Sequence, residues 1–136
     1  MPQFEEQKAQ QNPISLELAC SALKELWSPR VVGQVNNQYI KVAKVQGEFP
    51  WHSHEHEDEM FLVLRGVLCI GRSEADGGPV SLHAGEFFVV PRGVRHNTSA
   101  TEETWVVLVE TVTTLHTGSE KTPFTRSIAE QLGSRS

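Results

Sequence analysis

The spacing of hydrophobic residues along the chain changes near residue 30. Before that point, apolar residues recur every three or four positions, which is the period of a helix with one buried face. Ser15 suits the N-cap of such a helix, and Ser28 and Pro29 would end it, because the residue before a proline avoids helical geometry. We therefore predict one helix within residues 15–27, with a buried face formed by Leu16, Ala19, Leu23, Leu26 and Trp27.

Beyond residue 30 the apolar segments are short, rich in β-branched and aromatic residues, and separated by turn-forming residues. Asn36 and Asn37 are typical of a hairpin turn, and residues 76–78 and 91–93 mark two further turns. Several short strands at close spacing predict an all-β fold, a sandwich or a small barrel. The predicted strands are residues 31–35, 38–46, 59–72, 80–83, 86–90, 95–99 and 104–112.

The strand that begins at Glu59 is apolar on both sides. Alternate side chains of a strand point to opposite sides of a sheet. One side would carry Glu59, Phe61 and Val63, and the other Met60, Leu62 and Leu64. Because a strand with one wet side would alternate apolar and polar residues, we expect one side to line a barrel and the other to be covered. The cover would be the N-terminal helix or a partner subunit, and a homodimer is the simplest arrangement.

The length of the chain fits a single domain. Of the 136 residues, we place the domain at residues 15–112, between a flexible tail at 1–14 and an extension at 113–136. One or two helical turns are predicted within residues 125–132 of this extension.

Composition restricts the partners and the compartment. The formal net charge of −5 argues against nucleic acid and anionic membranes as partners. No apolar run approaches the roughly 20 residues of a membrane helix, and the polar N-terminus does not resemble a secretory signal. Cys20 and Cys69 lie far apart and are expected to be reduced, so a cytoplasmic location is predicted.

Histidine and acidic residues are concentrated just before the long apolar strand. Residues 51–59 contain three histidines and four acidic residues. His52 and His54 are separated by one residue, so on an extended chain both imidazoles would lie on one side, as two ligands of a metal ion would. Glu59 is predicted to face the barrel interior, where a carboxylate needs a partner charge or a metal ion. The alternative is a solvated acidic loop without an ion.

A second stretch, residues 85–96, would bring another histidine to the same place. It contains a glycine turn, an apolar strand, a Pro-Arg-Gly turn and then His96, which can point back inside. The two stretches resemble the two motifs of the cupin superfamily, G(x)5HxH(x)3–4E(x)6G and G(x)5PxG(x)2H(x)3N. The sequence departs from these motifs at Gly47, which is one residue too close to His52, and at Ala100, where the family has asparagine.

The resemblance covers about residues 38–112 and implies a jelly-roll β-barrel with one divalent transition metal ion per subunit, whether Mn, Fe, Ni, Co, Cu or Zn. The implied ligands are His52, His54, Glu59 and His96. His56 also alternates with His52, but the four residues between His54 and Glu59 match the family, which favours His54 and leaves His56 on the rim. The chain also resembles small cupins described as mannose-6-phosphate isomerase-like.

Further residues are candidates for a substrate pocket beside the metal ion. Four are apolar and would otherwise be plain barrel core, and three are polar and would otherwise lie on the surface. The apolar candidates are Phe61, Val63, Phe88 and Val90, and the polar candidates are Tyr39, Lys41 and Arg95.

Four protein ligands would leave one or two positions open on a five- or six-coordinate ion. The resemblance therefore implies a metal-dependent enzyme, an oxygenase, isomerase or lyase, acting on a small polar organic molecule. Glu59 would then be the catalytic base as well as a ligand. The alternative is a non-enzymatic protein that binds a sugar or a carboxylate through the metal ion.

Overall fold

Seven β-strands make up most of the chain that the computed structural model describes, which is residues 12–115, 118 and 125–133. The strands are β1 Arg30–Val35, β2 Gln38–His52, β3 Glu59–Arg65, β4 Val67–Arg72, β5 Val80–His83, β6 Phe87–Val90 and β7 His96–Thr111. The helices are α1 Leu16–Ser21, the short 3-10 helix η2 Glu74–Asp76 and α2 Ile128–Gln131. The predicted all-β fold is confirmed, and no helix in these residues is long and apolar enough to cross a membrane.

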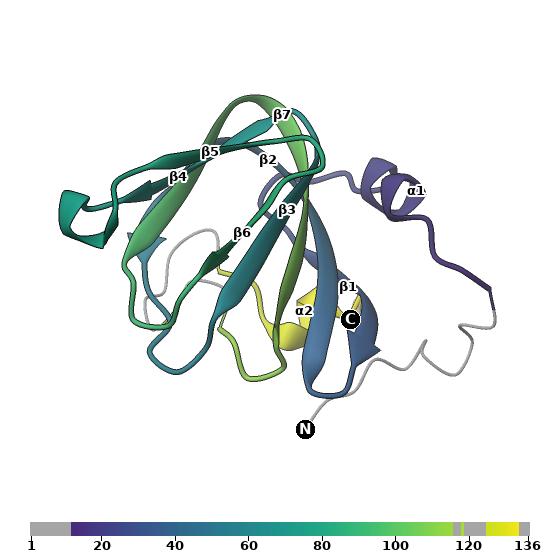
Figure 1. The fold of residues 1–136 in the computed structure, drawn as a ribbon. Coiled ribbons are helices and arrows are strands. Elements are labelled where there is room, and N and C mark those ends of the chain that lie inside the picture. Colours follow the sequence, from purple (N-terminus) through teal and green to yellow (C-terminus); the bar gives the residue numbers. More distant parts are fainter. Residues whose placement is uncertain (1–11, 116–117, 119–124, 134–136) are drawn as a thin grey trace.

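Two long strands, β2 and β7, hold the barrel together (Figure 1). They pair antiparallel along most of their length, from Gln38↔Thr111 to His52↔His96. The second half of β7 also pairs with β3, whereas its first half pairs with β4. Each long strand therefore runs through both halves of the barrel. The last residue of β2 and the first residue of β7 lie side by side at the same end of the barrel.

Side chains that point inward form the main core of the barrel. The core includes the inward residues of β3, as the alternation predicted, together with Trp27 and Phe49, whose rings are 4.9 Å apart. On the outer side of the sheet, Leu62 and Leu64 pack in a second cluster with α1. Helix α1 packs against β2 and β7 on this outer side, in the same cluster as Leu62 and Leu64, so the N-terminal helix supplies part of the expected cover.

The N-terminal helix is shorter than predicted. It ends at Ser21 instead of continuing to Trp27, which adopts a positive φ of 57°. The backbone N–H of Trp27 donates to the carbonyl of Lys44, and its indole Nε1–H donates to the carbonyl of Gln46. Pairing with β2 and burial in the barrel core thus replace the last helical turns, so the expected helix face with Leu26 and Trp27 does not exist.

Several strand boundaries also differ from the prediction, and β2 continues to His52 instead of ending at Gln46. The segment 59–72 is divided at Gly66, whose φ of 89° is left-handed and whose backbone lies against Thr104. A Cβ at Gly66 would lie 3.1 Å from the Cα of Thr104, so only glycine fits there without strain. The segments 95–99 and 104–112 are one continuous strand, because β7 pairs with β4 and then with β3 without ending.

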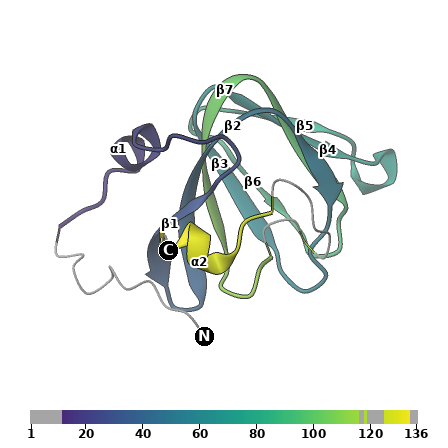
Figure 2. The ribbon, with the colours of Figure 1, turned by 180° about the vertical axis from the view of Figure 1, so that it is seen from behind.

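Helix α2 lies beside β1 (Figure 2). Ser127 and Glu130 form a capping box at its start, and Ile128 and Leu132 pack against the small cluster of Val31, Tyr39 and Val112. The helical turn predicted in the C-terminal extension is therefore present and is attached to the barrel. The predicted tail falls mostly on residues 1–11, which lie outside the described residues.

Candidate metal centre

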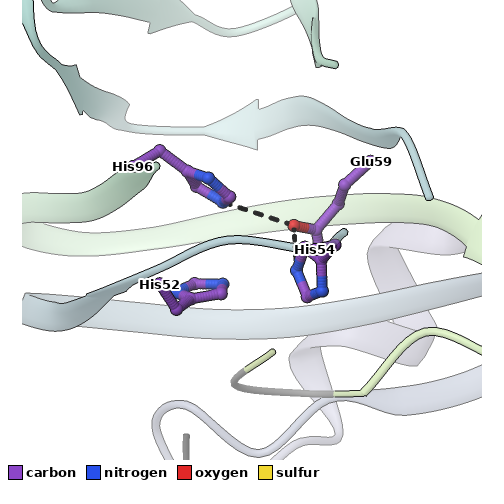
Figure 3. A group of neighbouring side chains, drawn as sticks. All are labelled: His52, His54, Glu59 and His96. Atoms are coloured by element: carbon purple, nitrogen blue, oxygen red, sulfur yellow. Dashed lines mark ion pairs between the residues drawn. The ribbon is translucent and has the colours of Figure 1, made fainter. Parts of the chain in front are cut away.

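Three histidines and one glutamate meet inside the barrel where β2 ends and β7 begins (Figure 3). His52 is the last residue of β2, and His96 is the first residue of β7 and its register partner, with ring centroids 4.5 Å apart. His54 follows in the loop, 5.0 Å from the ring of His52, and Glu59 begins β3. Three of these residues lie within residues 52–59, and His96 lies about 40 positions further along the chain. The pairing of β2, β7 and β3 brings all four together.

The ligand atoms of this cluster converge on one point. All four lie within 4.8 Å of one another, and all four side chains are buried. Oε1 of Glu59 is 3.2 Å from Nε2 of His54 and 3.5 Å from Nε2 of His96. This separation leaves room for one ion between them, because metal–nitrogen and metal–oxygen bonds are about 2.0–2.2 Å long.

Hydrogen bonds fix which nitrogen of two rings faces the centre. Nδ1 of His52 lies 3.0 Å from the carbonyl oxygen of Pro50, and Nδ1 of His96 lies 3.0 Å from that of Val94. An Nδ1–H that donates to a carbonyl leaves Nε2 with a free lone pair, the form in which histidine binds a metal ion.

Three buried atoms of the cluster have no hydrogen-bond partner, namely Nε2 of His54, Nε2 of His96 and Oε1 of Glu59. Buried polar atoms are almost always satisfied, because leaving one without a partner costs about 1–3 kcal/mol. A divalent ion bonded to all three would satisfy them together, so these residues fit a bound metal ion.

Backbone contacts hold the loop between His54 and Glu59 in place. The N–H of Gly93 donates to the carbonyl of His54 at 2.7 Å, and the N–H of Arg92 donates to Oδ1 of Asp58 at 2.9 Å. The turn at residues 91–93 therefore supports the loop that carries His54. The two sequence motifs are joined by these bonds as well as by the cluster.

The electrostatics of the cluster suit metal binding. Burial, together with neighbouring His96, lowers the pKa of His52 to about 4, so this ring is neutral at physiological pH. Burial acts to raise the pKa of Glu59, but the close approach of the His54 and His96 rings outweighs it and holds the pKa well below its usual value. The cluster thus offers a neutral imidazole and an ionised carboxylate, as metal ligands must be.

Sequence reasoning missed Glu110, which is buried next to this cluster. Glu110 is the cross-strand partner of Glu59, and its Oε1 lies 2.5 Å from Nζ of Lys41. Burial raises the pKa of Glu110 well above its usual value, the charge of Glu59 adds to this effect, and Lys41 opposes it. A signal was present in the sequence, because Glu110 follows Val106 and Leu108 on the inward side of β7, where a carboxylate needs a partner.

A cavity of about 40 Å³ adjoins the cluster. Polar side chains line it at the metal end, where His52, Glu59, Thr98 and Glu110 face it. The rest of its wall is mainly apolar and includes Trp27, Phe49, Phe61, Leu68, Val106 and Leu108. Such a wall suits an apolar group, but about 40 Å³ is far below the roughly 300–1,000 Å³ of ligand pockets, so a substrate would enter only if the cavity widened.

The structure separates the predicted pocket residues. Phe61 lines the cavity, whereas Val63, Phe88 and Val90 belong to the surrounding core without lining it.

The polar candidates do not line this cavity. Tyr39 and Lys41 are fully buried, so the alternative of a surface position is wrong for both, and Arg95 is exposed. Lys41 is inside because Glu110 neutralises its charge. The side chain of His56 is 80% exposed and lies outside the cluster, on the loop that was predicted to be solvated.

The barrel and its four-residue cluster match a known protein family. A family model for the cupin domain (Cupin_2) matches residues 39–112. The chain belongs to the cupin family. The predicted cupin fold, a jelly-roll β-barrel, is thereby confirmed, since the matched residues span β2 to the end of β7.

Two proteins resemble the chain in sequence. An uncharacterised protein of Bacillus subtilis, YdbB, is 31% identical over 88 residues, which are 65% of this chain and 76% of that protein. The crystal structure of a cupin-2 domain protein from Shewanella frigidimarina is 38% identical with a TM-score of 0.68, covering 72% of this chain and 93% of that one.

A more distant structure contains a metal ion. The hydroquinone 1,2-dioxygenase PnpCD, solved with Cd2+ and 4-hydroxybenzonitrile, has a TM-score of 0.60 and covers 82% of this chain and 74% of that one. At 17% identity this likeness shows a shared fold alone.

Proposed function

We propose that this cupin holds one divalent transition metal ion through His52, His54, Glu59 and His96, and that it is a metal-dependent enzyme acting on a small organic molecule. The observation that supports this most strongly is the convergence of three buried, unpartnered ligand atoms on one point. Burial of four polar side chains at that point would be costly for a protein that made no use of them.

The reaction classes that this site suits are oxygenation, isomerisation and elimination. A bound ion would act as a Lewis acid, lower the pKa of a bound water or, if it is iron, support oxygen chemistry. Glu59 is the side chain best placed to take a proton from a substrate, because its carboxylate lies at the cluster and also lines the cavity. The aromatic and aliphatic wall excludes water from the bound molecule.

The cavity wall favours one kind of substrate over another. Among the described residues that line it there is no lysine or arginine, so the wall offers no cation for a phosphate group. We infer that the substrate is an organic molecule with an apolar body and a hydroxyl, carbonyl or carboxylate group that reaches the metal end. A sugar phosphate, the substrate that a mannose-6-phosphate isomerase-like cupin suggests, is therefore disfavoured.

Metal analysis of protein purified without a His-tag tests the first step of the proposal. We expect about one transition metal ion per chain in the wild type and in His56→Ala, and a large loss in His96→Ala. His56 is the matched control because it is a neighbouring histidine with an exposed side chain. Equal loss in the two variants, or a wild type that neither contains nor takes up metal, would contradict the site.

A second experiment separates an enzyme from a binding protein. Metal-loaded protein is assayed for turnover and oxygen consumption on diketones, hydroxy acids and small phenols, and calorimetry measures which of them bind. We expect metal-dependent turnover that Glu59→Gln lowers and Glu57→Gln, on the exposed loop, does not. Saturable binding without turnover of any compound that binds would favour the alternative, a non-enzymatic binding protein.

We also propose that the chain forms a homodimer through the outer face of β3 and β6. Phe87 and Val89 on β6 are 64% and 41% exposed, opposite Leu62 and Met60 on β3. Helix α1 covers Leu62 and Leu64 only in part, so an apolar strip remains at the sheet edge. Sedimentation at micromolar concentration should give the mass of a dimer, and Phe87→Lys should give a monomer. A monomeric wild type would refute this arrangement.

A further inference from the structure

A chain of three buried polar side chains leads away from the metal centre toward the C-terminus. Nζ of Lys41 on β2 lies 2.5 Å from Oε1 of Glu110 on β7, and it also donates to Oε1 of Gln131 on α2. The three residues are at most 3% exposed, although Lys41 and Gln131 are 90 residues apart in the sequence. Such a group inside a small domain needs a physical explanation, because buried charges are expensive.

The inner end of this chain faces the candidate metal ligand Glu59. Glu59 and Glu110 are register partners on β3 and β7, and both line the same cavity. The second carboxylate oxygen of Glu110, Oε2, is buried without a hydrogen-bond partner. Two carboxylates placed side by side repel each other unless a cation offsets one of the charges. The ammonium group of Lys41, 2.5 Å from Oε1 of Glu110, provides that cation.

The outer end is held rigidly by α2. Nε2 of Gln131 donates to the carbonyl of Arg126 at 2.9 Å, so its Oε1 must face Lys41. The capping box of Ser127 and Glu130 fixes the start of the helix, and Leu132 packs against β1 and β2. The position of α2 therefore determines the position of the acceptor that Lys41 uses.

A purely structural ion pair would not require this arrangement. Replacing a buried ion pair by apolar side chains of similar volume is often neutral or stabilising, so stability alone does not explain its presence. Neighbours that orient a metal ligand, in contrast, typically change metal affinity by about 10–100-fold when they are removed.

We propose that Lys41, Glu110 and Gln131 are positioning residues of the metal centre, which fix the orientation of the carboxylate facing Glu59 and so make the centre depend on the C-terminal helix. This inference rests on the proposed metal site. Removing Lys41 or Gln131 should release the Glu110 carboxylate from its position beside Glu59, and removing Glu110 should take that carboxylate away. Each change should alter both the affinity and the geometry of the bound ion.

The test is titration of the full, metal-free chain with Co2+, which reports affinity and, through its visible absorption bands, ligand geometry. Glu110→Gln, Lys41→Met and Gln131→Leu should each raise the dissociation constant by about 10–100-fold and shift the absorption bands. Gln131→Leu is the mildest of these changes, because it leaves the ion pair in place. Circular dichroism and urea unfolding identify any variant that loses its fold.

Two further variants distinguish positioning from a structural role. Val42→Ala removes a buried side chain next to Lys41 whose own packing is on the outer face of the sheet, so it should lower stability but leave Co2+ affinity and spectrum unchanged. The double variant Lys41→Met with Glu110→Leu should keep much of the wild-type stability. It should nevertheless bind Co2+ more weakly than the wild type, with shifted absorption bands.

The outcomes separate this inference from the proposed function on which it rests. A wild type that fails to bind Co2+ overturns the metal site and the inference together. The inference alone is overturned if the wild type binds Co2+ and either the double variant or Gln131→Leu binds it equally well, with the same spectrum. Weaker binding in Val42→Ala to the same extent as in Gln131→Leu would also overturn it, because the effect would then follow stability.

Discussion

Acidification should destabilise the metal-free protein through His52. Burial lowers the pKa of this histidine from 6.5 to about 4 in the folded chain. One pKa unit corresponds to about 1.4 kcal/mol, so the full difference corresponds to about 3 kcal/mol of unfolding free energy. This is a large share of the roughly 5–15 kcal/mol that stabilises a typical domain.

The sign follows from which state binds the proton. Between pH 6.5 and pH 4 the unfolded chain protonates His52 while the folded chain keeps it neutral. The unfolding free energy should therefore fall as the pH drops through this window. Below pH 4 protonation of His52 should cause no further fall, because both states then bind the proton. From pH 6.5 to pH 4.5 the expected loss from His52 is about 2 kcal/mol.

Urea unfolding of EDTA-treated protein at pH 4.5, 5.5 and 6.5 measures this loss. His52→Gln removes the titrating ring, so the wild type should lose about 2 kcal/mol more than this variant over the window. His56→Gln, at an exposed position, should follow the wild type. Parallel pH dependence in the wild type and His52→Gln would refute the reasoning, because every other titrating group is common to both.

Three further predictions concern the barrel and its helices. Gly66→Ala should lower the unfolding free energy by more than about 1 kcal/mol in thermal or urea unfolding, because its φ is positive and a Cβ would press on Thr104; an unchanged midpoint would contradict this. Burial raises the pKa of the Cys20 thiol to about 11, so at pH 8 Cys20 should react with Ellman's reagent far more slowly than half-buried Cys69, and equal rates would count against its burial. Ser127→Ala should cost α2 about 1 kcal/mol and speed hydrogen exchange at residues 128–132, and unchanged exchange would show that the cap contributes nothing.

The parts of the fold that the sequence predicted correctly depend on local patterns. Alternation after Glu59 predicted which side chains of β3 face inward, since burial alternates along the strand as the residues do. The spacing of His52, His54 and Glu59 is also local, and the turn before His96 predicted the return of the chain. These features require only neighbouring residues, which is why periodicity was sufficient.

The errors arose where distant residues decide the structure. The helical period continues through Trp27, but hydrogen bonds from Trp27 to β2 and its place in the barrel core end the helix at Ser21. The bond between Lys41 and Gln131 joins residues 90 positions apart, and no local pattern indicates it. Lys41 was thus assigned to a surface or a substrate contact, although its partners lie inside the barrel.

The central claim is tested most directly by anomalous X-ray scattering from crystals of protein purified without a His-tag. The data are recorded at the absorption edge of the metal that these crystals contain. The account predicts a single strong peak per chain, about 2.0–2.2 Å from ligand atoms of His52, His54, Glu59 and His96. A peak at the exposed loop around His56, or no peak between these four side chains in crystals soaked with Mn2+, Co2+ or Zn2+, would contradict it.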